Sequence, residues 1–373
     1  MAISSASLAY RRSALMTASK LTVKPPNEEV LKARDNFQDF CTLMGKPPAK
    51  HMLEWHAELC TGEDSECLLG IAGQNTAILA PRGSAKSTVL GLFAAWMIGR
   101  HALAKKMLRI LYIAYMVDIS RAKSATIKGI LTSSKYREVF PSVRLSKIKR
   151  SDEYWSIDYE FAGIDTAGEE AFTIACGGLK GAITSKRSQL VLIDDPIKSA
   201  ASINNPDIRR EMEQTWSNVI APTMFQGARA ICLGTRFHFD DIHATLFVPK
   251  HNWNQIVQKA VITDADGKQR SYWPDFWSMK YLNERKMENR VAFAYQYLNT
   301  AVKSTDVGIS PELIIKSAVP DDYDCIGVGI DLSAGLREKN DWTVMTLGGI
   351  KEGKIYLIDP VSYTHLTLPT SHN

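Results

Sequence analysis

A lysine and three hydroxyl side chains lie close together in the stretch APRGSAKST, residues 80–88. The stretch follows an apolar run and precedes a long apolar segment, which predicts a strand, a loop and a helix in that order. In such a loop, backbone N–H groups and the positive end of the helix hold phosphates, a lysine reaches the outer phosphate oxygens, and a hydroxyl ligates Mg²⁺. The last two roles would fall to Lys86 and Ser87. The candidate nucleotide-contacting residues are Pro81, Arg82, Gly83, Ser84, Ala85, Lys86, Ser87 and Thr88.

Alanine stands at both positions where the usual phosphate-loop pattern has glycine. Ala80 ends the strand and can keep an extended backbone, but Ala85 carries a Cβ where the loop would wrap the phosphates. Gly83 and the small Ser84 still allow the loop backbone to bend and to approach a phosphate closely. Taken alone, the stretch is either a working phosphate loop or a strand-to-helix turn that happens to contain a lysine.

A second pattern, LVLIDDPIKS at 190–199, places two acids directly after four apolar residues. Pro196 ends the strand, so both carboxylates emerge at its carboxyl end, where open α/β sheets bind ligands. Asp194 would hold Mg²⁺, and Asp195 would orient and deprotonate an attacking water. The alternative is a strand that ends in an Asp-rich turn.

A third pattern, ICLGTRFHFDDI at 231–242, ends a strand in Gly234, Thr235 and Arg236. A polar residue at the tip of a strand beside the Asp194 strand could sense a bound γ-phosphate and pass that state onward. The alternative is an ordinary loop after an edge strand, with His238 as a hydrogen-bonded loop residue.

These patterns need a parallel sheet to bring them together. The predicted strands at 76–80, 109–115, 190–193 and 230–233 are near-continuous apolar runs, as expected for strands buried on both faces. The segment 205–220 predicts a helix, with Asn205 as N-cap, Pro206 at the first helical position and apolar residues every fourth position. The expected fold class is therefore α/β, a mostly parallel sheet with helices on both faces.

Composition narrows the class of protein. The 373 residues are 45% apolar and 23% charged, which favours a globular chain with room for two domains. The six cysteines form no CxxC pair, which argues against a zinc site or a disulfide framework. The longest apolar run, 89–99, is too short to span a bilayer, so no membrane partner is expected.

The basic run RLSKIKR at 144–150 is either a contact for a polyanion or a solvated charge run.

Together, PRGSAKST, LVLIDDP, GTRFHFDDI and the later IDLSAG and NDWTV resemble a large terminase subunit, the DNA-packaging motor of tailed phages and related viruses. The resemblance runs from about residue 35 to residue 360, and the order of motifs is more specific than any one of them. It implies a P-loop ATPase of the additional-strand type that uses ATP and Mg²⁺ to move double-stranded DNA into a procapsid in the host cytoplasm. It also implies a portal protein, a small terminase subunit and a homo-oligomeric ring as partners.

The resemblance assigns further roles. Arg82 would stabilise transition-state charge as an arginine finger supplied in cis, the alternative being an arginine that faces phosphate or solvent. Gly234, Thr235 and Arg236 would couple hydrolysis to movement. A following RNase H-like nuclease would use Mg²⁺ or Mn²⁺, with Asp331 as its first ligand. Asp341 matches a further acid of the family, although capping the next strand explains it equally well.

The implied domains are 1–49, an N-terminal arm and helices; 50–245, the ATPase; 246–322, a connecting helical subdomain; and 323–360, part of the nuclease, expected to open with a three-stranded meander. Residues 361–373 match no expected strand or helix and resemble translated adapter sequence, so we expect a truncated nuclease with a non-native tail. Two alternatives are a P-loop helicase-type motor and a nucleotide- or DNA-binding fragment that does not hydrolyse ATP.

Overall fold

The computed structural model describes residues 27–60, 74–180, 186–300, 320–331 and 343–363. These fall into two compact units, residues 1–304 and 305–373, and each is described by itself. No helix in the described ranges is long and apolar enough to cross a membrane.

The centre of the first unit is an eight-stranded sheet with the strand order β3-β4-β5-β2-β6-β7-β1-β8. The strands from β5 to β8 in this order run parallel, while β4 pairs antiparallel with β5 and with β3. The strands are β1 Asn75–Leu79, β2 Ile110–Ala114, β3 Leu145–Arg150, β4 Tyr154–Ile157, β5 Ile174–Gly178, β6 Ser188–Asp194, β7 Met224–Gly234 and β8 Trp253–Val257. The four predicted strands correspond to β1, β2, β6 and β7, and the predicted mostly parallel sheet is confirmed.

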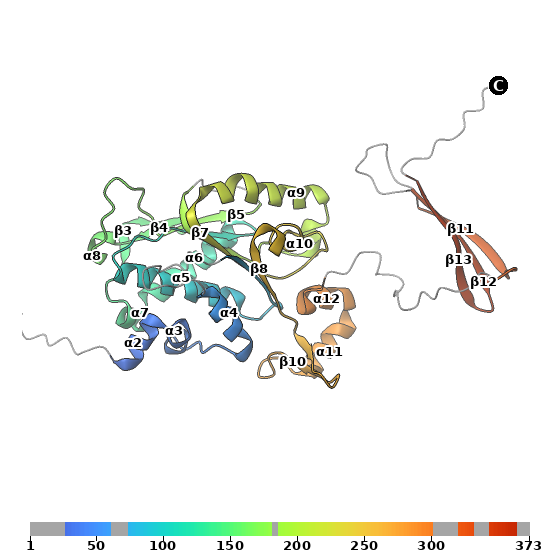
Figure 1. Cartoon of the computed structure of the whole chain (residues 1–373), viewed down its shortest axis with the longest axis horizontal. Helices are drawn as coiled ribbons and strands as arrows, with labels where there is room; N and C mark the ends of the chain where they lie inside the picture. Colours follow the sequence, from blue (N-terminus) through green and yellow to red (C-terminus); the bar gives the residue numbers. More distant parts are fainter. Residues whose placement is uncertain (1–26, 61–73, 181–185, 301–319, 332–342, 364–373) are drawn as a thin grey trace, which may run out of the picture. The chain divides into compact units, whose positions relative to one another are not determined.

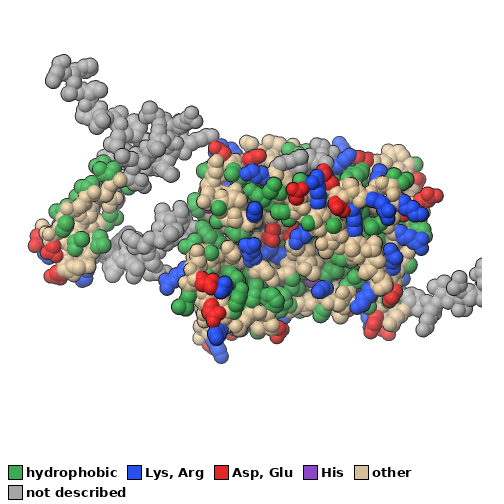
Figure 2. Space-filling view, turned by 180° about the vertical axis from the view of Figure 1, so that it is seen from behind, with side chains coloured by type: hydrophobic (Ala, Val, Ile, Leu, Met, Phe, Trp, Pro, Cys, Tyr) green, Lys and Arg blue, Asp and Glu red, His purple; other side chains and the backbone are tan. Residues whose placement is uncertain are grey.

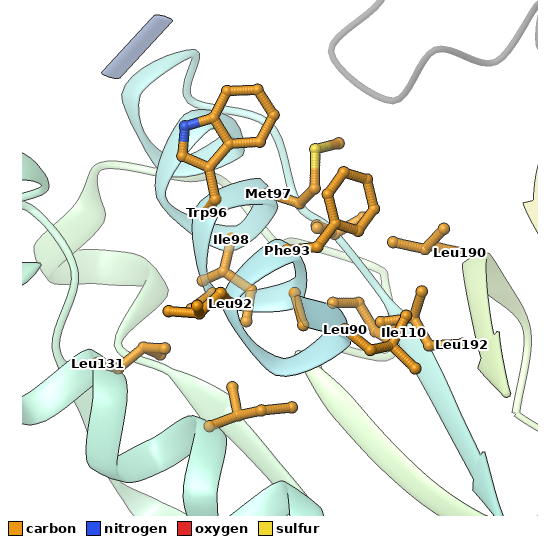
Figure 3. Packing of buried hydrophobic residues seen from close by; sticks show 14 of the residues in the cluster. Leu90, Leu92, Phe93, Trp96, Met97, Ile98, Ile110, Leu131, Leu190 and Leu192 are labelled. Carbon is orange, nitrogen blue, oxygen red and sulfur yellow. The ribbon is translucent and has the colours of Figure 1, made fainter. Parts of the chain in front are cut away.

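Helices cover both faces of this sheet (Figure 1). One face carries α2 Glu28–Asp35, α3 Phe37–Leu43, α4 Leu53–Leu59, α5 Lys86–Leu103, α6 Val117–Thr132 and α7 Ser134–Val139, and the other carries α9 Pro206–Thr215 and α10 Ile242–Thr245. Successive strand residues alternate between the two apolar clusters: Tyr112 belongs to the first and Ile113 to the second. This alternation explains why the buried strands read as continuous apolar runs. Figure 3 shows α5 packed against β2 and β6 in the first cluster.

The helix expected at 205–220 forms with its predicted cap, because the Asn205 side chain accepts a hydrogen bond from the Asp207 N–H and Pro206 follows. It runs as α9 and then as a π-helical turn, η3 Trp216–Ile220, and the buried Met212, Trp216 and Ile220 confirm its apolar face. Within the segment expected to be a connecting helical subdomain, α11 Met279–Glu288 and α12 Arg290–Leu298 are separated by Asn289, which ends one helix and caps the next.

The segment 246–322, expected as a connecting subdomain, supplies strand β8 to the main sheet and then a two-stranded ribbon, β9 Val261–Thr263 with β10 Gln269–Ser271. A small apolar cluster joins this ribbon to α11 and α12, through Ala260, Tyr272, Trp277, Leu282 and Phe293. In the second unit, β11 Cys325–Asp331, β12 Thr343–Lys351 and β13 Lys354–Tyr363 form an antiparallel meander, as expected. Strand β13 continues through Tyr363, so the expectation that no strand extends past residue 360 is wrong for residues 361–363.

Several histidines are buried in the first unit, and burial lowers the pKa of His101 and His243 to about 4. A histidine in the unfolded chain titrates near 6.5, so between these values the unfolded chain binds protons that the folded chain does not. The contribution that these neutral histidines make to the free energy of unfolding is therefore complete above pH 6.5. It is lost progressively as the pH falls toward 4. We expect a fall of about 1.4 kcal/mol per pH unit for each of the two histidines.

Urea titrations at pH 7.0, 6.0 and 5.3 measure this slope. His243→Gln should reduce the pH dependence, while the same change at the exposed His251 should leave it unchanged. Equal slopes in the wild type and His243→Gln would contradict the prediction.

Candidate nucleotide site

The loop between β1 and α5 is held to β7 at its start and braced internally. Its first N–H, from Ala80, donates to the Gly234 carbonyl at 3.0 Å, and the buried Ser84 hydroxyl donates to the Pro81 carbonyl at 2.6 Å. Gly83 has a φ of +84°, and a Cβ there would lie 3.1 Å from the Trp277 ring. The positive φ and the close approach to Trp277 both favour glycine at this position of the loop.

Ala85 adopts a left-handed backbone, with φ 62° and ψ 22°, directly before Lys86. This is the position at which the usual pattern has glycine, so the loop keeps the conformation and tolerates the Cβ. A left-handed residue other than glycine costs about 1–2 kcal/mol. Ala80, by contrast, is not among the residues with positive φ.

Ala85→Gly is therefore expected to raise the free energy of unfolding by about 1 kcal/mol, since relief of the strain exceeds the added flexibility of the unfolded chain. Chemical denaturation measures the gain. Ala104→Gly, at a position with negative φ, is the matched control and should give no gain. An Ala85→Gly variant that is less stable than the wild type would contradict the left-handed geometry.

Lys86 opens α5 and is almost completely buried, with 4% of its surface exposed. Its ammonium group donates to the Ala80 and Pro81 carbonyls at 3.2 and 3.1 Å and to the Thr235 hydroxyl at 2.9 Å. Burial lowers its pKa, and the negative charges of Asp195 and Asp194 oppose that shift. The lysine is thus held as a cation inside the loop by the residues that the three sequence patterns singled out.

Asp194 ends β6 beside this lysine, and its two carboxylate oxygens accept hydrogen bonds from two different elements. The Ser87 hydroxyl donates to Oδ1 at 2.9 Å, and the Tyr112 hydroxyl on β2 donates to Oδ2 at 3.0 Å. Burial raises the pKa of Asp194, and the neighbouring Asp195 raises it further, while the positive charge of Lys123 on α6 acts in the opposite direction. A cation placed here would therefore be favoured electrostatically.

Ser87 and Asp194 offer the ligand chemistry that Mg²⁺ prefers, one hydroxyl and one carboxylate, at the start of a helix that would face phosphates. Among the described residues, no group of three His, Cys, Asp or Glu side chains is placed to hold a metal ion. The pair fits a Mg²⁺ ion that takes its remaining ligands from nucleotide phosphates and water, as this ion usually does.

Asp195 follows with a left-handed φ of 44°, and its N–H donates to the Leu233 carbonyl on β7. Its carboxylate lies beside Lys86, at 3.7 Å between Oδ1 and Nζ. Oδ1 accepts no hydrogen bond from the described residues, although it is buried. The structure therefore separates the two acids: the Asp194 carboxylate is held by two hydroxyls, whereas the Asp195 side chain is 46% exposed and its buried Oδ1 accepts no hydrogen bond from the described residues.

Thr235 lies at the carboxyl end of β7, between the loop and the acids. Its hydroxyl donates to the Ala80 carbonyl at 3.1 Å and accepts from Lys86. The residue is buried, so this contact is shielded from solvent. A tip residue predicted to sense phosphate thus contacts the lysine that would bind it.

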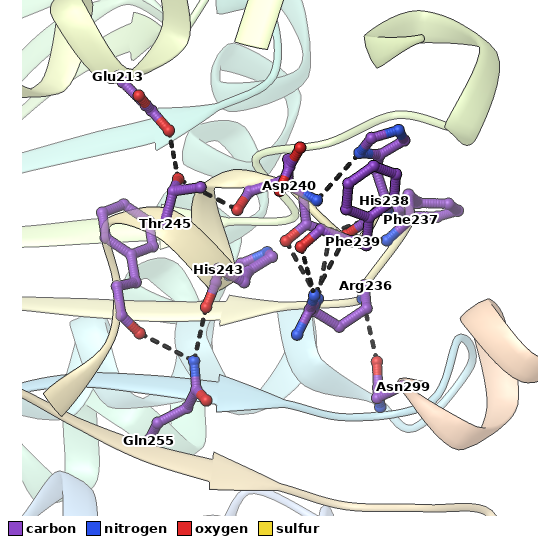
Figure 4. A network of polar contacts seen from close by, with 12 residues as sticks. Glu213, Arg236, Phe237, His238, Phe239, Asp240, His243, Thr245, Gln255 and Asn299 are labelled. Carbon is purple, nitrogen blue, oxygen red and sulfur yellow. Dashed lines mark hydrogen bonds and ion pairs between the residues drawn. The ribbon is translucent and has the colours of Figure 1, made fainter. Parts of the chain in front are cut away.

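Gly234 and Arg236 flank this threonine. A Cβ on Gly234 would lie 2.7 Å from the His243 ring, so only glycine allows α10 to pack here. Arg236 is held by its own turn: its guanidinium pairs with Asp241 at 3.1 Å and donates to the His238 and Phe239 carbonyls (Figure 4). The Asp241 carboxylate also accepts from the Phe237 and His238 N–H groups, so the turn is a fixed unit.

Two contacts that the sequence did not single out join this region to α12. The Asn299 side chain accepts from the Arg236 N–H at 3.0 Å and donates to the Gln258 carbonyl at 2.8 Å. The Arg82 N–H donates to the Gln296 carbonyl at 2.9 Å. The end of α12 therefore contacts both the phosphate loop and the segment that contains Thr235 and Arg236. The available signal was Asn299 itself, a residue type suited to the left-handed end of a helix.

For the other predicted site residues, the structure gives a position but no contact that tests the predicted role. Arg82 and Thr88 are exposed on the loop and on the first turn of α5. Asp331 is the last residue of β11 and pairs with Val344 in register. Asp341 lies outside the described residues.

The strand order places β7 between the phosphate-loop strand β1 and the acid strand β6, all parallel. With the loop, lysine and acids at the carboxyl ends of these strands, the first unit has a P-loop NTPase fold of the additional-strand class. This confirms the predicted fold class for this unit.

No protein-family model and no curated protein matches the chain. Solved structures resemble it at low identity. The large terminase of a thermophilic bacteriophage is 12% identical, with a TM-score of 0.38 over 91% of this chain and 68% of that one. The HK97 bacteriophage large terminase is 15% identical, with a TM-score of 0.43 over 87% and 66%. The ATPase domain of the Thermus phage P74-26 large terminase is 14% identical, with a TM-score of 0.40 over 74% and 99%. Similarities this low do not identify a function. The fold of the first unit is assigned from its strand order and from the geometry of its phosphate loop.

Proposed function

We propose that the chain is a large terminase subunit, an ATP-driven motor that moves viral double-stranded DNA into a procapsid in the host cytoplasm. The observation that carries the proposal is the meeting of Lys86, Asp195 and Thr235 at the carboxyl ends of β1, β6 and β7. The order of sequence motifs supports a packaging ATPase over other P-loop enzymes. A portal protein, a small terminase subunit and a ring of copies are the partners proposed with it.

The residues take the following roles in ATP hydrolysis. The loop N–H groups and Lys86 would hold the phosphates, and Ser87 and Asp194 would hold a Mg²⁺ ion, whose charge would offset the charge that develops on the phosphate oxygens. Asp195, which lies beside Lys86 with 46% of its side chain exposed, is proposed to orient the attacking water and accept its proton. Arg82, exposed on the loop, is proposed to stabilise the transferring phosphoryl group.

The proposed coupling route starts at Thr235 and ends at α12. Replacement of a protein contact of Lys86 by a phosphate changes what Thr235 binds, and the Arg236 turn carries the change to Asn299. For the second unit we propose the start of an RNase H-like nuclease with Asp331 as one ligand for Mg²⁺ or Mn²⁺. Its described strands are antiparallel, unlike the second parallel sheet of a helicase-type motor.

The test is steady-state ATP hydrolysis with Mg²⁺ by the wild type and Asp195→Asn. The substitution keeps the shape and removes the base, so turnover should fall by at least about 100-fold with nucleotide binding retained. Asp240→Asn, at an exposed acid in the Arg236 turn, is the matched control. Turnover that survives Asp195→Asn would overturn the assigned base. A folded chain that binds a fluorescent ATP analogue without turnover would support the non-hydrolysing alternative.

Thr235→Val should lower kcat by about 10- to 100-fold, because a hydrogen bond to a charged group contributes about 1.5–3 kcal/mol. Thr235→Ser keeps the hydroxyl and should retain most of the activity. Measurement of kcat together with the nucleotide Kd separates positioning of Lys86 from binding. Equal kcat in the valine and serine variants would show that the hydroxyl has no such role.

A further inference from the structure

A pocket of about 530 Å³ lies at the end of the sheet that carries β3, between α7 and this strand. Four of the side chains that line it are cations: Arg137, Arg144, Lys147 and Arg150. The remaining described lining residues are uncharged, so no acid offsets this charge within the pocket. We call these four residues the β3 basic groove.

Unlike neighbouring cations, these four are not matched to acids. On the adjacent helix α6, Arg121 pairs with Glu153, and Lys128 pairs with Asp152 at 2.9 Å. No member of the β3 basic groove forms an ion pair in the described structure. Arg144 is instead oriented by the Phe161 ring, whose centre lies 3.7 Å from its guanidinium carbon. Stacking leaves the edge of a guanidinium available for two parallel hydrogen bonds to an anion.

The strand that presents the groove is an open edge. Strand β3 is the first in the sheet order and contacts β4 irregularly, with register at Leu145 and Arg150 only. Ile148, which lies between the groove residues Lys147 and Arg150 on this strand, is 92% exposed. Figure 2 shows Lys and Arg side chains gathered at the end of the first unit that carries β3. The groove thus faces solvent along a strand rather than closing around a small ligand.

The sheet separates this groove from the nucleotide site. Five strands lie between β3 and β1 in the sheet order, and a strand spacing of about 4.8 Å puts the two sites roughly 29 Å apart. A bound nucleotide therefore cannot explain the groove. Four cations without ion-pair partners in the described structure, two of them on the open edge strand β3, fit a partner that presents several anions in succession.

We propose that the β3 basic groove binds the phosphodiester backbone of duplex DNA, independently of sequence. The inference deepens the proposed function, on which it rests, by naming a contact surface for its substrate. Four cations that each neutralise a phosphate would give log K a dependence on log salt with a slope of about −3.6, since each contact contributes about −0.9.

The experiment is binding of a fluorescein-labelled 30-base-pair duplex by fluorescence anisotropy, without nucleotide, from 50 to 250 mM KCl. Arg144→Gln combined with Lys147→Gln should weaken binding at least tenfold at 100 mM salt and reduce the slope by about 1.8. Arg137→Gln combined with Arg150→Gln should do the same, and it leaves the Phe161 stacking in place. Lys250→Gln combined with Lys268→Gln removes equal charge at exposed positions elsewhere and should change the Kd less than twofold.

Unchanged DNA binding in both groove variants would overturn the inference. So would poly-glutamate that competes as well as DNA at equal charge, because the groove would then suit an acidic protein segment. ATP hydrolysis, measured on the same preparations, keeps the two proposals apart. A chain that hydrolyses ATP but binds DNA without the groove contradicts only the groove, whereas groove-dependent DNA binding without turnover contradicts only the ATPase.

Discussion

Replacing Lys86 by alanine is expected to abolish measurable ATP turnover, with a loss of at least about 1000-fold, and to weaken nucleotide binding. The lysine contacts the phosphate loop, through the Ala80 and Pro81 carbonyls, and the Thr235 hydroxyl at the same time. Its charge also lies 3.7 Å from Asp195. Without it, the phosphates lose their cation and the acids lose the charge that offsets their repulsion.

The measurement combines turnover with a thermal shift on addition of Mg·ATP. Lys86→Ala should lose both, while Lys135→Ala, an exposed lysine on α7, should lose neither. Lys86→Arg tests geometry, because it keeps the charge and enlarges the head group in a buried site. Full ATP-induced stabilisation of a folded Lys86→Ala chain would refute the phosphate-loop assignment.

Arg229→Ala is expected to lower the free energy of unfolding by about 3–5 kcal/mol, the cost of breaking a buried ion pair from one side. Arg229 lies on β7 with 1% of its surface exposed. Its guanidinium donates to the Leu59 carbonyl, to the Glu58 carboxylate and to the Thr76 hydroxyl at 3.1, 3.2 and 2.8 Å. It therefore joins the end of α4 to β1, the strand that leads into the phosphate loop.

Urea denaturation of the wild type, Arg229→Ala and Arg229→Lys measures this. The lysine variant keeps the charge but cannot reach all acceptors, so its stability should be intermediate. Arg270→Ala is the matched control: it breaks an exposed pair with Asp264 and should cost less than about 1 kcal/mol. A loss at Arg229→Ala no larger than this control would contradict the assigned role.

The local parts of the site could be predicted from the sequence, because each is a short pattern at a strand end. Lys86 follows one apolar run and Asp194 another, and parallel strands bring such ends to one edge of the sheet. The contacts between patterns could not be predicted. Tyr112 and Asp194 are 82 residues apart, and Arg236 and Asn299 are 63 apart, so only the tertiary fold brings them together.

There are also physical reasons why strands β3 and β5 were not predicted from the sequence. Strand β3 reads LSKIKR and lies at the edge, where burial does not select apolar residues. Strand β5 reads IACGG, and paired glycines carry no strand preference. The break at Asn289 was similarly hidden, since the residues on either side favour helix and a single capping side chain determines the boundary.

The position of β1 in the sheet also determines when the site can exist. Strand β1 pairs with β7 and β8, both made much later, and Lys86 precedes Thr235 by 149 residues. At ordinary rates of translation, roughly 7 to 30 s separate synthesis of the loop from synthesis of the strands that complete it. During that interval the phosphate-loop strand has neither of its neighbours. The nucleotide pocket proposed above is therefore complete only after almost the whole first unit has left the ribosome, so ATP bound there would stabilise the finished fold but would not guide its early steps.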